Sequence, residues 1–268
     1  MIRKVLPRSI RQRIVRIVSR HKLRRCPAVA IDATSLRASV PDLDCPDLSL
    51  EWPAIERLIG AAGISPRSGG VNPGDRRAIY QLTRLIAPRN VLEIGTHVGS
   101  STLMFALALK HDGGRITTVD IQDVNADEGA WKKTGCAQRP RDMLASMGCL
   151  DHVSFVTSAS VDYLAGCRER YDLIFLDGLH EASMLYREIP LALRALAPGG
   201  LVLLHDVFPD LKPLWPNGAA IPGPWLALER FLGEGAGFRV HPLGELPWPT
   251  KLGTRMTSLA LLLSAGQR

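Results

Sequence analysis

Two apolar runs that each end in polar residues, with a helical stretch between them, constrain the fold of this chain most strongly. The first run is Tyr171–Leu176, and the second is Leu201–Leu204, which follows a turn at Pro198–Gly200. This order predicts strand, helix and strand. The polar residues that follow the two runs are Asp177, His180, His205 and Asp206. Right-handed crossovers place the carboxyl ends of parallel strands at one edge of a sheet, so we expect these side chains to converge there as a catalytic cluster.

Strand-length apolar runs alternate with helical stretches along most of the chain. Five strands are expected at Asn90–Ile94, Arg115–Asp120, His152–Thr157, Tyr171–Leu176 and Leu201–His205. A later helix and two closing strands are expected at Pro222–Gly233, Phe238–Pro242 and Ser258–Leu263. The alternation predicts an α/β fold with a doubly wound, mostly parallel sheet of seven strands, whose closing pair forms an antiparallel edge hairpin.

The region before this sheet has a different composition, which divides the chain into three parts. The expected parts are a basic amphipathic tail over residues 1–25, a linker and helical extension over 26–72, and the α/β domain over 73–268. Within the extension, Glu51–Ala62 is expected to be a short helix. Gly74 and Asp75 are expected to cap the next helix, which runs to about Ala87. This layout would also allow a homo-oligomer that associates through the extension.

The net charge of +7 belongs to the tail rather than to the rest of the chain. Residues 1–25 hold ten Lys or Arg and no acid, so the remainder keeps 23 of the 33 bases against 26 acids, a net charge of −3. This acidic remainder argues against a nucleic-acid groove across the folded body. In the tail, Ile10, Ile14, Ile17 and Val18 recur at helical spacing, which suits an anionic membrane surface or a protein partner. The alternatives are a solvated helix, a disordered arm and a mitochondrial presequence.

Cysteine usage and hydropathy indicate the compartment. Five cysteines are scattered without CxxC pairs, which is typical of reduced thiols. No apolar run approaches the ~20 residues that a membrane-spanning helix needs, and the first residues lack the apolar stretch of a secretory signal. We therefore expect a cytoplasmic protein, for which the tail is a candidate peripheral contact with a membrane surface.

A glycine-bearing turn follows the first expected strand of the sheet. Gly95 and Gly99 would let the backbone approach a ligand closely, and Ser100 or Ser101 could cap the helix that follows. The spacing is GxxxG rather than the GxGxxG of dinucleotide-binding folds, which disfavours a nicotinamide-dependent oxidoreductase. Asp120 comes 25 residues after Gly95 and ends the second expected strand, where it could accept hydrogen bonds from ribose hydroxyls. The turn and the acid together predict a nucleoside site.

The segments VLEIGTHVGSS, TTVDI, YDLIFLDGLH and PGGLVLLHDV resemble the successive motifs of class I S-adenosylmethionine-dependent methyltransferases. The resemblance covers about residues 73–206, and within that superfamily it is greatest to the metal-dependent O-methyltransferases, such as those that act on catechols and antibiotic sugars. It implies S-adenosylmethionine as the cofactor. For the amino-acid end of the cofactor, with the start of the next helix, it implies Glu93, Gly95, Thr96, Gly99, Ser100 and Ser101. For the ribose and adenine it implies Asp120, Ile121, Ser158, Ala159 and Ser160.

The resemblance also implies a divalent metal, Mg²⁺ or Mn²⁺, which would anchor the acceptor hydroxyl and lower its pKa. The implied ligands are Asp177, His205 and Asp206, and His180 takes the place of the general base. His205 stands where the family usually has an oxygen ligand, and imidazole favours transition metals over Mg²⁺. Three interpretations of His205 remain open: it binds a Mn²⁺- or Fe²⁺-like ion, it lies behind the ligands, or it marks a weakened metal site. A shift of one residue would exchange His205 and Asp206 as the principal ligand.

The resemblance implies methyl transfer to a hydroxyl of a small molecule or saccharide. Such a transfer is an in-line displacement, so positioning the acceptor and removing its proton supply most of the rate. Two long loops, residues 123–139 and 208–224, carry Trp131 and Trp215 and are candidates for contact with the acceptor. The alternatives are an RNA methyltransferase steered by the basic tail and a non-catalytic protein that binds S-adenosylmethionine.

Overall fold

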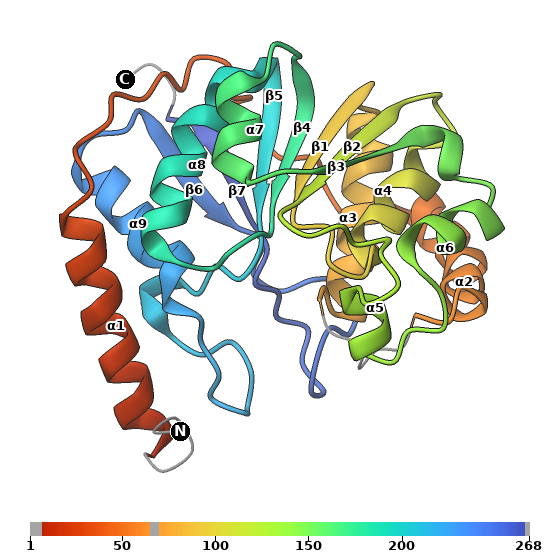
Figure 1. Ribbon diagram of the computed structural model, residues 1–268, viewed down its shortest axis with the longest axis horizontal. Helices are drawn as coiled ribbons and strands as arrows, with labels where there is room; N and C mark the ends of the chain where they lie inside the picture. The colour runs from red at the N-terminus through yellow and green to blue at the C-terminus, as the bar shows by residue number, and fades with distance from the viewer. Residues whose placement is uncertain (1–6, 65–69, 266–268) are drawn as a thin grey trace.

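The computed structural model describes residues 7–64 and 70–265. At its centre is a sheet of seven strands in the order β3-β2-β1-β4-β5-β7-β6 (Figure 1). The strands are β1 (Asn90–Ile94), β2 (Arg115–Asp120), β3 (Val153–Thr157), β4 (Tyr171–Leu176), β5 (Leu196–Leu204), β6 (Phe238–Pro242) and β7 (Ala260–Ser264). The first five run parallel, and β7 lies antiparallel between β5 and β6. The expected mostly parallel sheet with an antiparallel edge is confirmed.

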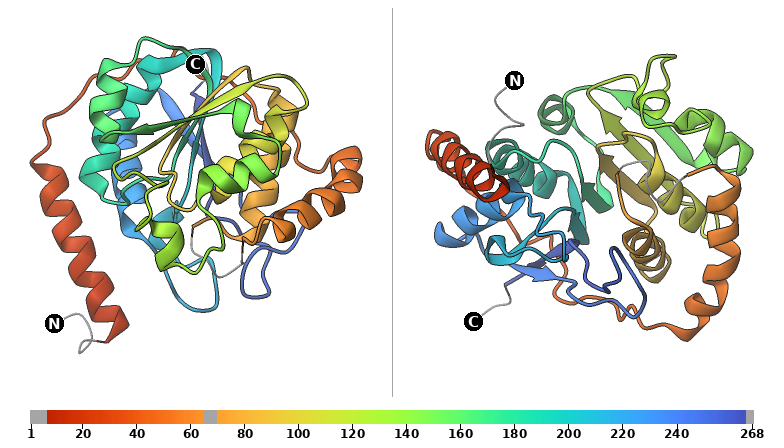
Figure 2. Two further views of the ribbon diagram at one scale, coloured as in Figure 1. Left: turned by 45° about the vertical axis from the view of Figure 1, so that its right-hand side comes forward. Right: turned by 90° about the horizontal axis from the view of Figure 1, so that it is seen from below.

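Helices cover both faces of the sheet, as the two views in Figure 2 show. They are α1 (Arg8–Arg24), α2 (Pro46–Ala61), α3 (Pro73–Ile86), α4 (Ser100–Leu109), α5 (Ala130–Lys133), α6 (Pro140–Ser146), α7 (Ser160–Gly166), α8 (Ala182–Ala195) and α9 (Pro222–Gly233). One apolar core joins the sheet to α2, α3, α4 and α6, and a second joins it to α7, α8 and α9. In β4, Leu173 and Phe175 enter the first core while Ile174 and Leu176 enter the second. Burial on both faces explains why the central strands are continuous apolar runs.

The fifth strand differs from the expected one at its start. It begins at Leu196, because the Pro198–Gly200 segment, which reads as a turn, is taken into the strand as an irregularity. Tyr171 pairs with Leu196, and two residues later Leu173 pairs with Leu201, so the register shifts between them. Gly200 also bridges to Leu36 of the N-terminal segment. The irregular part of β5 therefore pairs with the segment that contains Leu36.

The helices before the sheet share its core. Trp52 of α2 packs against Tyr80 of α3 with ring centroids 5.9 Å apart, and Arg84 forms an ion pair of 2.7 Å with Glu51. The cap of α3 lies two residues before the expected Gly74. Asn72, rather than Gly74 or Asp75, caps the helix, because its side-chain oxygen accepts hydrogen bonds from both of their backbone N–H groups.

The basic tail forms a helix, α1, that lies along α8 and α9 at the outer side of the molecule (Figures 1 and 2). Lys22 forms an ion pair of 3.0 Å with Glu181, and Arg20 one of 3.5 Å with Glu229. Within the described ranges, no helix is both long and apolar enough to cross a lipid bilayer.

Candidate functional site

A cavity of about 640 Å³ lies at the carboxyl ends of the parallel strands. Most of the cofactor residues implied by the sequence line it: Gly95, Thr96, Ser100, Ser101, Asp120, Ile121, Ser158, Ala159 and Ser160. The polar residues that follow β4 and β5 line the same cavity: Asp177, His180, His205 and Asp206. The structure therefore brings the expected nucleoside site and the expected catalytic cluster into one space.

The turn after β1 approaches the turn after β4 at backbone contact. Gly95 has a φ of +101°, and a Cβ at this position would lie 2.3 Å from the carbonyl oxygen of Asp177. The Asp177 N–H also donates to the carbonyl of Ile94 over 2.9 Å. Only glycine combines this φ with this contact. The absence of a side chain at Gly95 thus lets the backbone of Asp177 pack directly against the end of β1.

Asp120 is held in place by backbone groups at the end of β2. Its two carboxylate oxygens accept hydrogen bonds of 3.0 Å from the N–H groups of His97 and Gln122. Asp120 lines the cavity, so its remaining lone pairs are available to hydroxyl donors there. This geometry suits a ribose diol. Ile121 follows at the rim with 72% of its surface exposed.

Glu93 and Gly99 do not line the cavity, although the sequence places them among the cofactor residues. Glu93 is fully buried below the turn, where its carboxylate accepts hydrogen bonds from Ser101, Thr102 and Thr118. Burial raises the pKa of Glu93 to about 7, against the opposing effect of these three hydroxyls. Gly99 has a φ of +76° and occupies the N-cap position of α4. Both residues therefore stabilise the turn after β1 without lining the cavity.

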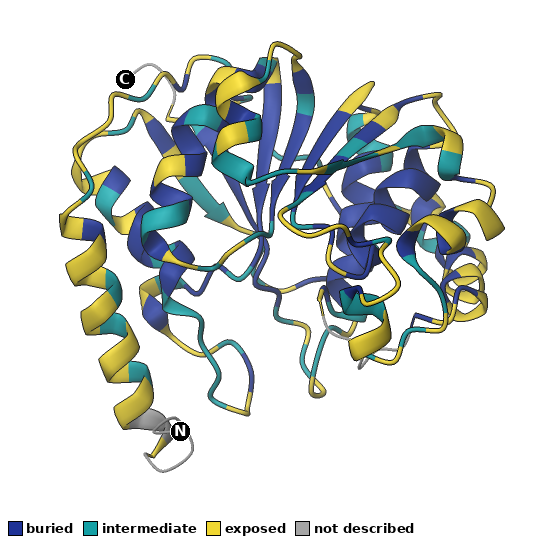
Figure 3. Ribbon diagram, in the orientation of Figure 1, coloured by how far each residue is buried: buried dark blue, intermediate teal, exposed yellow. Residues whose placement is uncertain are grey.

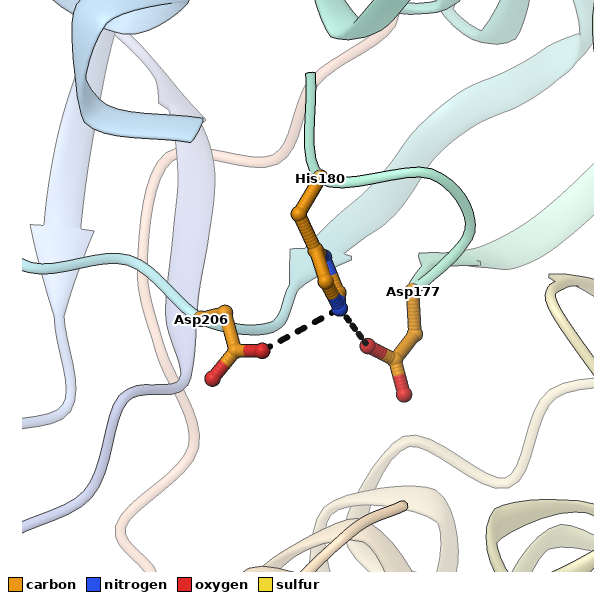
Figure 4. A group of neighbouring side chains, drawn as sticks. All are labelled: Asp177, His180 and Asp206. Atoms are coloured by element: carbon orange, nitrogen blue, oxygen red, sulfur yellow. Dashed lines mark ion pairs between the residues drawn. The ribbon is translucent and has the colours of Figure 1, made fainter. Parts of the chain in front are cut away.

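Three side chains after β4 and β5 gather their donor atoms in one place (Figure 4). His180 Nε2 lies 3.2 Å from Asp206 Oδ2 and 4.0 Å from Asp177 Oδ1. One donor atom from each of these residues lies within 4.8 Å of the other two, a spacing that could hold a metal ion. Two carboxylates and one imidazole form a donor set that suits Mn²⁺ or Fe²⁺, and Mg²⁺ through the carboxylates.

His205 adjoins this cluster from its buried side, where its Nδ1 also lies 3.8 Å from Asp206 Oδ2. It is buried, and its Nδ1 lies 2.9 Å from Asp177 Oδ1 while its Nε2 lies 3.2 Å from Asp75 Oδ2. Burial opposes the charged form, but Asp177, Asp206 and these hydrogen bonds outweigh it and raise the pKa of His205 well above its usual value. Both ring nitrogens of His205 therefore face carboxylate oxygens.

Asp75 contacts the site through His205, although no sequence pattern pointed to this residue. It lies in the first turn of α3, is fully buried, and accepts hydrogen bonds from His205 and from the hydroxyl of Thr257. Asp75 and His205 are 130 residues apart. Their contact follows from how α3 packs on the sheet, and no local pattern encodes it.

A smaller cavity of about 160 Å³ adjoins the cluster and shares His205 and Asp206 with the larger one. Trp215 lines it, is 5% exposed, and donates through Nε1 to the carbonyl of Met256 over 3.2 Å. Lys251 Nζ lies 4.2 Å from the centre of the Trp215 ring. Trp131, from the other candidate loop, lines neither cavity and donates instead to the carbonyl of Ala126.

Residues 92–207 match the protein family described as "Methyltransferase domain". The catechol O-methyltransferase of Niastella koreensis is 29% identical over 151 residues, which are 55% of this chain and 62% of that protein. The tapetum-specific methyltransferase 1 of Arabidopsis thaliana is 31% identical over 115 residues, which are 40% of this chain and 43% of that protein. The chain thus spans less than two thirds of the length of these curated relatives.

Solved structures extend the similarity to a larger share of the chain. The O-methyltransferase TomG from Streptomyces achromogenes, solved with S-adenosylmethionine, has a TM-score of 0.57 and 20% identity over 82% of this chain and 96% of that chain. An O-methyltransferase from Bacillus cereus, solved with S-adenosylhomocysteine, has a TM-score of 0.53 and 20% identity over 81% of this chain and 90% of that chain. Residues 92–207 of this chain are therefore similar to the methyltransferase domain family, and the fold of the chain is the one seen in these solved O-methyltransferase structures.

Proposed function

We propose that this chain is an S-adenosylmethionine-dependent O-methyltransferase that acts on a hydroxyl of a small molecule or saccharide with the help of a divalent metal. One observation carries the proposal: Asp120, shaped for a ribose diol, and the group Asp177, His180 and Asp206 line a single cavity. The O-methyltransferase names of the similar proteins support the same reaction.

The larger cavity is assigned to S-adenosylmethionine, which when bound supplies a methyl group on a positively charged sulfur. Asp120 would accept hydrogen bonds from the ribose hydroxyls, and Ile121 and the Ser158–Ser160 loop would hold the adenine. Gly95, Thr96 and the first turn of α4 would hold the amino-acid end, where the partial positive charge of the helix N-terminus favours a carboxylate. These residues bind and orient the cofactor, and Glu93 fixes the turn that presents it.

The metal is assigned to the carboxylates of Asp177 and Asp206, with His205 holding Asp177 in place from behind. A divalent cation at this position would lower the pKa of an acceptor hydroxyl. His180 Nε2 faces the same point and accepts the hydroxyl proton as general base. The alternative, that His180 is itself a metal ligand, is favoured by the three donor atoms within 4.8 Å of one another.

The acceptor is assigned to the smaller cavity, because that cavity adjoins Asp206 and carries an aromatic wall. Trp215 and Phe208 line this cavity with aromatic surface that suits a phenol or sugar, and Lys251 beside Trp215 would favour an acceptor with an acidic group. An RNA acceptor is disfavoured, since the chain outside residues 1–25 has a net charge of −3. A role without catalysis is disfavoured by the convergent cluster. Cytoplasmic location and self-association remain further parts of this proposal.

The proposal is tested by transfer of a labelled methyl group from S-adenosylmethionine to phenolic and saccharide acceptors. With the best acceptor, His180→Ala is expected to lower turnover by about 10²-fold or more while leaving cofactor affinity unchanged. Titration with Mn²⁺ then separates the two roles of His180. A general base leaves Mn²⁺ affinity unchanged on substitution, whereas a ligand does not. Near-normal turnover of His180→Ala would remove the residue from the mechanism, and no transfer to any acceptor by the wild type would contradict the proposal.

A further inference from the structure

The side of α1 that faces the body is mainly polar. Gln12 donates to the carbonyl of Gly218 over 3.1 Å, and Arg16 donates to the carbonyl of Leu211 over 2.9 Å. Ser19 is half-buried on the same side. In the described part of the helix, Leu23 is the one apolar residue on this side that is buried, with 4% of its surface exposed. The helix is therefore held to the body by hydrogen bonds and ion pairs, and its other apolar residues are left outside.

Those residues form a continuous stripe on the opposite side, which we call the outward stripe: Ile10, Ile14, Ile17 and Val18. Their exposed fractions are 45%, 45%, 60% and 47%. At about 100° per residue, the four side chains fall within an arc of about 100°. Figure 3 shows α1 exposed along most of its length, in contrast to the helices that pack on the sheet. An apolar stripe that points away from the described body of the protein is typical of a site that binds a partner.

Arginines flank the outward stripe. Arg13 and Arg24 border one of its edges, and Arg25 lies at its carboxyl end, all three exposed. Across residues 7–64 and 70–265, none of these three forms an ion pair, whereas Arg20 and Lys22, nearer the body, are paired with glutamates. These exposed arginines thus lie along one edge and at the carboxyl end of the outward stripe.

We propose that the outward stripe docks α1 onto an anionic lipid surface. An amphipathic helix that lies in the membrane interface presents apolar side chains to the acyl region and arginines to the headgroup phosphates, which is the pattern of this face. A second copy of the chain is a poorer occupant, because a two-fold contact through the stripe would bring two sets of arginines together. The proposal does not depend on the methyltransferase activity.

Docking would also orient the candidate acceptor site. The two carbonyl groups that accept from Gln12 and Arg16 belong to the loop that carries Trp215, which lines the smaller cavity. The membrane-facing helix and the acceptor wall are therefore directly connected. An acceptor that partitions into the membrane surface would meet this side of the enzyme first.

The proposal is tested by sedimentation of the full chain with vesicles of phosphatidylcholine alone or of phosphatidylcholine mixed with phosphatidylglycerol. The wild type is expected to bind the mixed vesicles, and the double variant Ile14→Ser with Ile17→Ser to partition at least about tenfold more weakly. A matched control, Leu50→Ser with Leu58→Ser, removes two exposed leucines from α2 and is expected to bind like the wild type. Circular dichroism establishes that both double variants keep the helix content of the wild type.

Three results would overturn the proposal. The wild type could fail to bind the mixed vesicles, or bind both kinds of vesicle equally, which would leave the arginines without a role. The Ile14→Ser with Ile17→Ser variant could bind as tightly as the wild type, which would place the contact elsewhere. If the wild type is instead a dimer that this variant dissociates, and vesicles are not bound, the outward stripe is an interface between copies of the chain.

Discussion

At the level of single residues, a buried string of hydrogen-bonded side chains, Asp177, His205, Asp75 and Thr257, links the candidate metal cluster to the core. His205 lies between Asp177 and Asp75, and Asp75 is held in turn by Thr257. Each ring nitrogen of His205 has a carboxylate partner, which fixes the orientation of the ring and of Asp177 beyond it. The string therefore sets the position of one proposed metal ligand from inside the core.

Breaking this string is expected to cost stability. Asp75→Leu leaves His205 and Thr257 without their partner, and loss of one member of a buried ion pair costs about 3 kcal/mol or more of unfolding free energy. Asp112→Leu is the control, since Asp112 is exposed, and its effect is expected to stay within about 0.5 kcal/mol. Urea denaturation measures both. Equal stability of the two variants would show that the string carries no net energy.

Glu93 is expected to make stability depend on pH. Its pKa of about 7 in the folded state lies above its ordinary value of 4.5, so the folded state binds the proton more tightly. Protonation of Glu93 therefore adds about 3 kcal/mol to the free energy of unfolding below pH 4.5, and this stabilisation is lost as the pH rises toward and through 7. Glu93→Gln removes the titration, so its stability relative to the wild type should increase between pH 5 and pH 8. A difference that stays constant with pH would contradict the buried, protonated carboxyl.

The sequence predicted the residues whose roles follow from position at a strand end, and missed those that depend on packing. Asp120 and Asp177 each end a strand, so their convergence on the cavity follows from the parallel topology. Asp75 and Lys251 reach the site from α3 and from a late loop, and no spacing rule relates them to it. His205 was placed at the correct edge, but its role depends on which groups its two ring nitrogens meet.

At the scale of the element, the turn between β1 and α4 is the part of the site that tolerates least change. Gly95→Ala would need an unfavourable φ and would press a Cβ against the backbone of Asp177. We expect a loss of at least about 2 kcal/mol in stability, together with weaker binding of S-adenosylmethionine. Gly113→Ala is the control, since Gly113 also has a positive φ but no atom within 4 Å of the added Cβ, so its cost is about 1 kcal/mol. Calorimetric titration would contradict this account if the two variants bound the cofactor equally.

The positions of several strands were predictable because the residue pattern of each strand agrees with its burial in the sheet. β1, β2, β4 and β6 match their expected bounds, since apolar runs of five or six residues between turns allow few alternatives. β5 starts earlier than expected, because the Pro198–Gly200 segment gains a partner in Leu36, which is far away in sequence. A turn signal is local, whereas pairing with a remote segment is not.

In the molecule as a whole, the apolar cores and the excess of basic residues belong to different parts of the chain. The sheet domain has two apolar cores, whereas residues 1–25 hold ten of the 33 basic residues. The sequence predicted that the tail forms an amphipathic helix, and α1 confirms the helix over Arg8–Arg24. The sequence did not predict that the polar side of this helix faces the body, because a helical wheel shows the faces of a helix but not which one is covered.

In the proposed enzyme, one cavity holds the nucleoside and the metal side by side. The most direct test is the NMR signal of S-adenosylmethionine labelled with ¹³C in its methyl group, bound to the protein and titrated with Mn²⁺. A paramagnetic ion at Asp177 and Asp206 is expected to broaden this signal strongly, Mg²⁺ is expected to leave it sharp, and Asp177→Ala is expected to abolish the effect of Mn²⁺. A methyl signal that stays sharp when both the cofactor and Mn²⁺ are bound to the wild type would contradict the account.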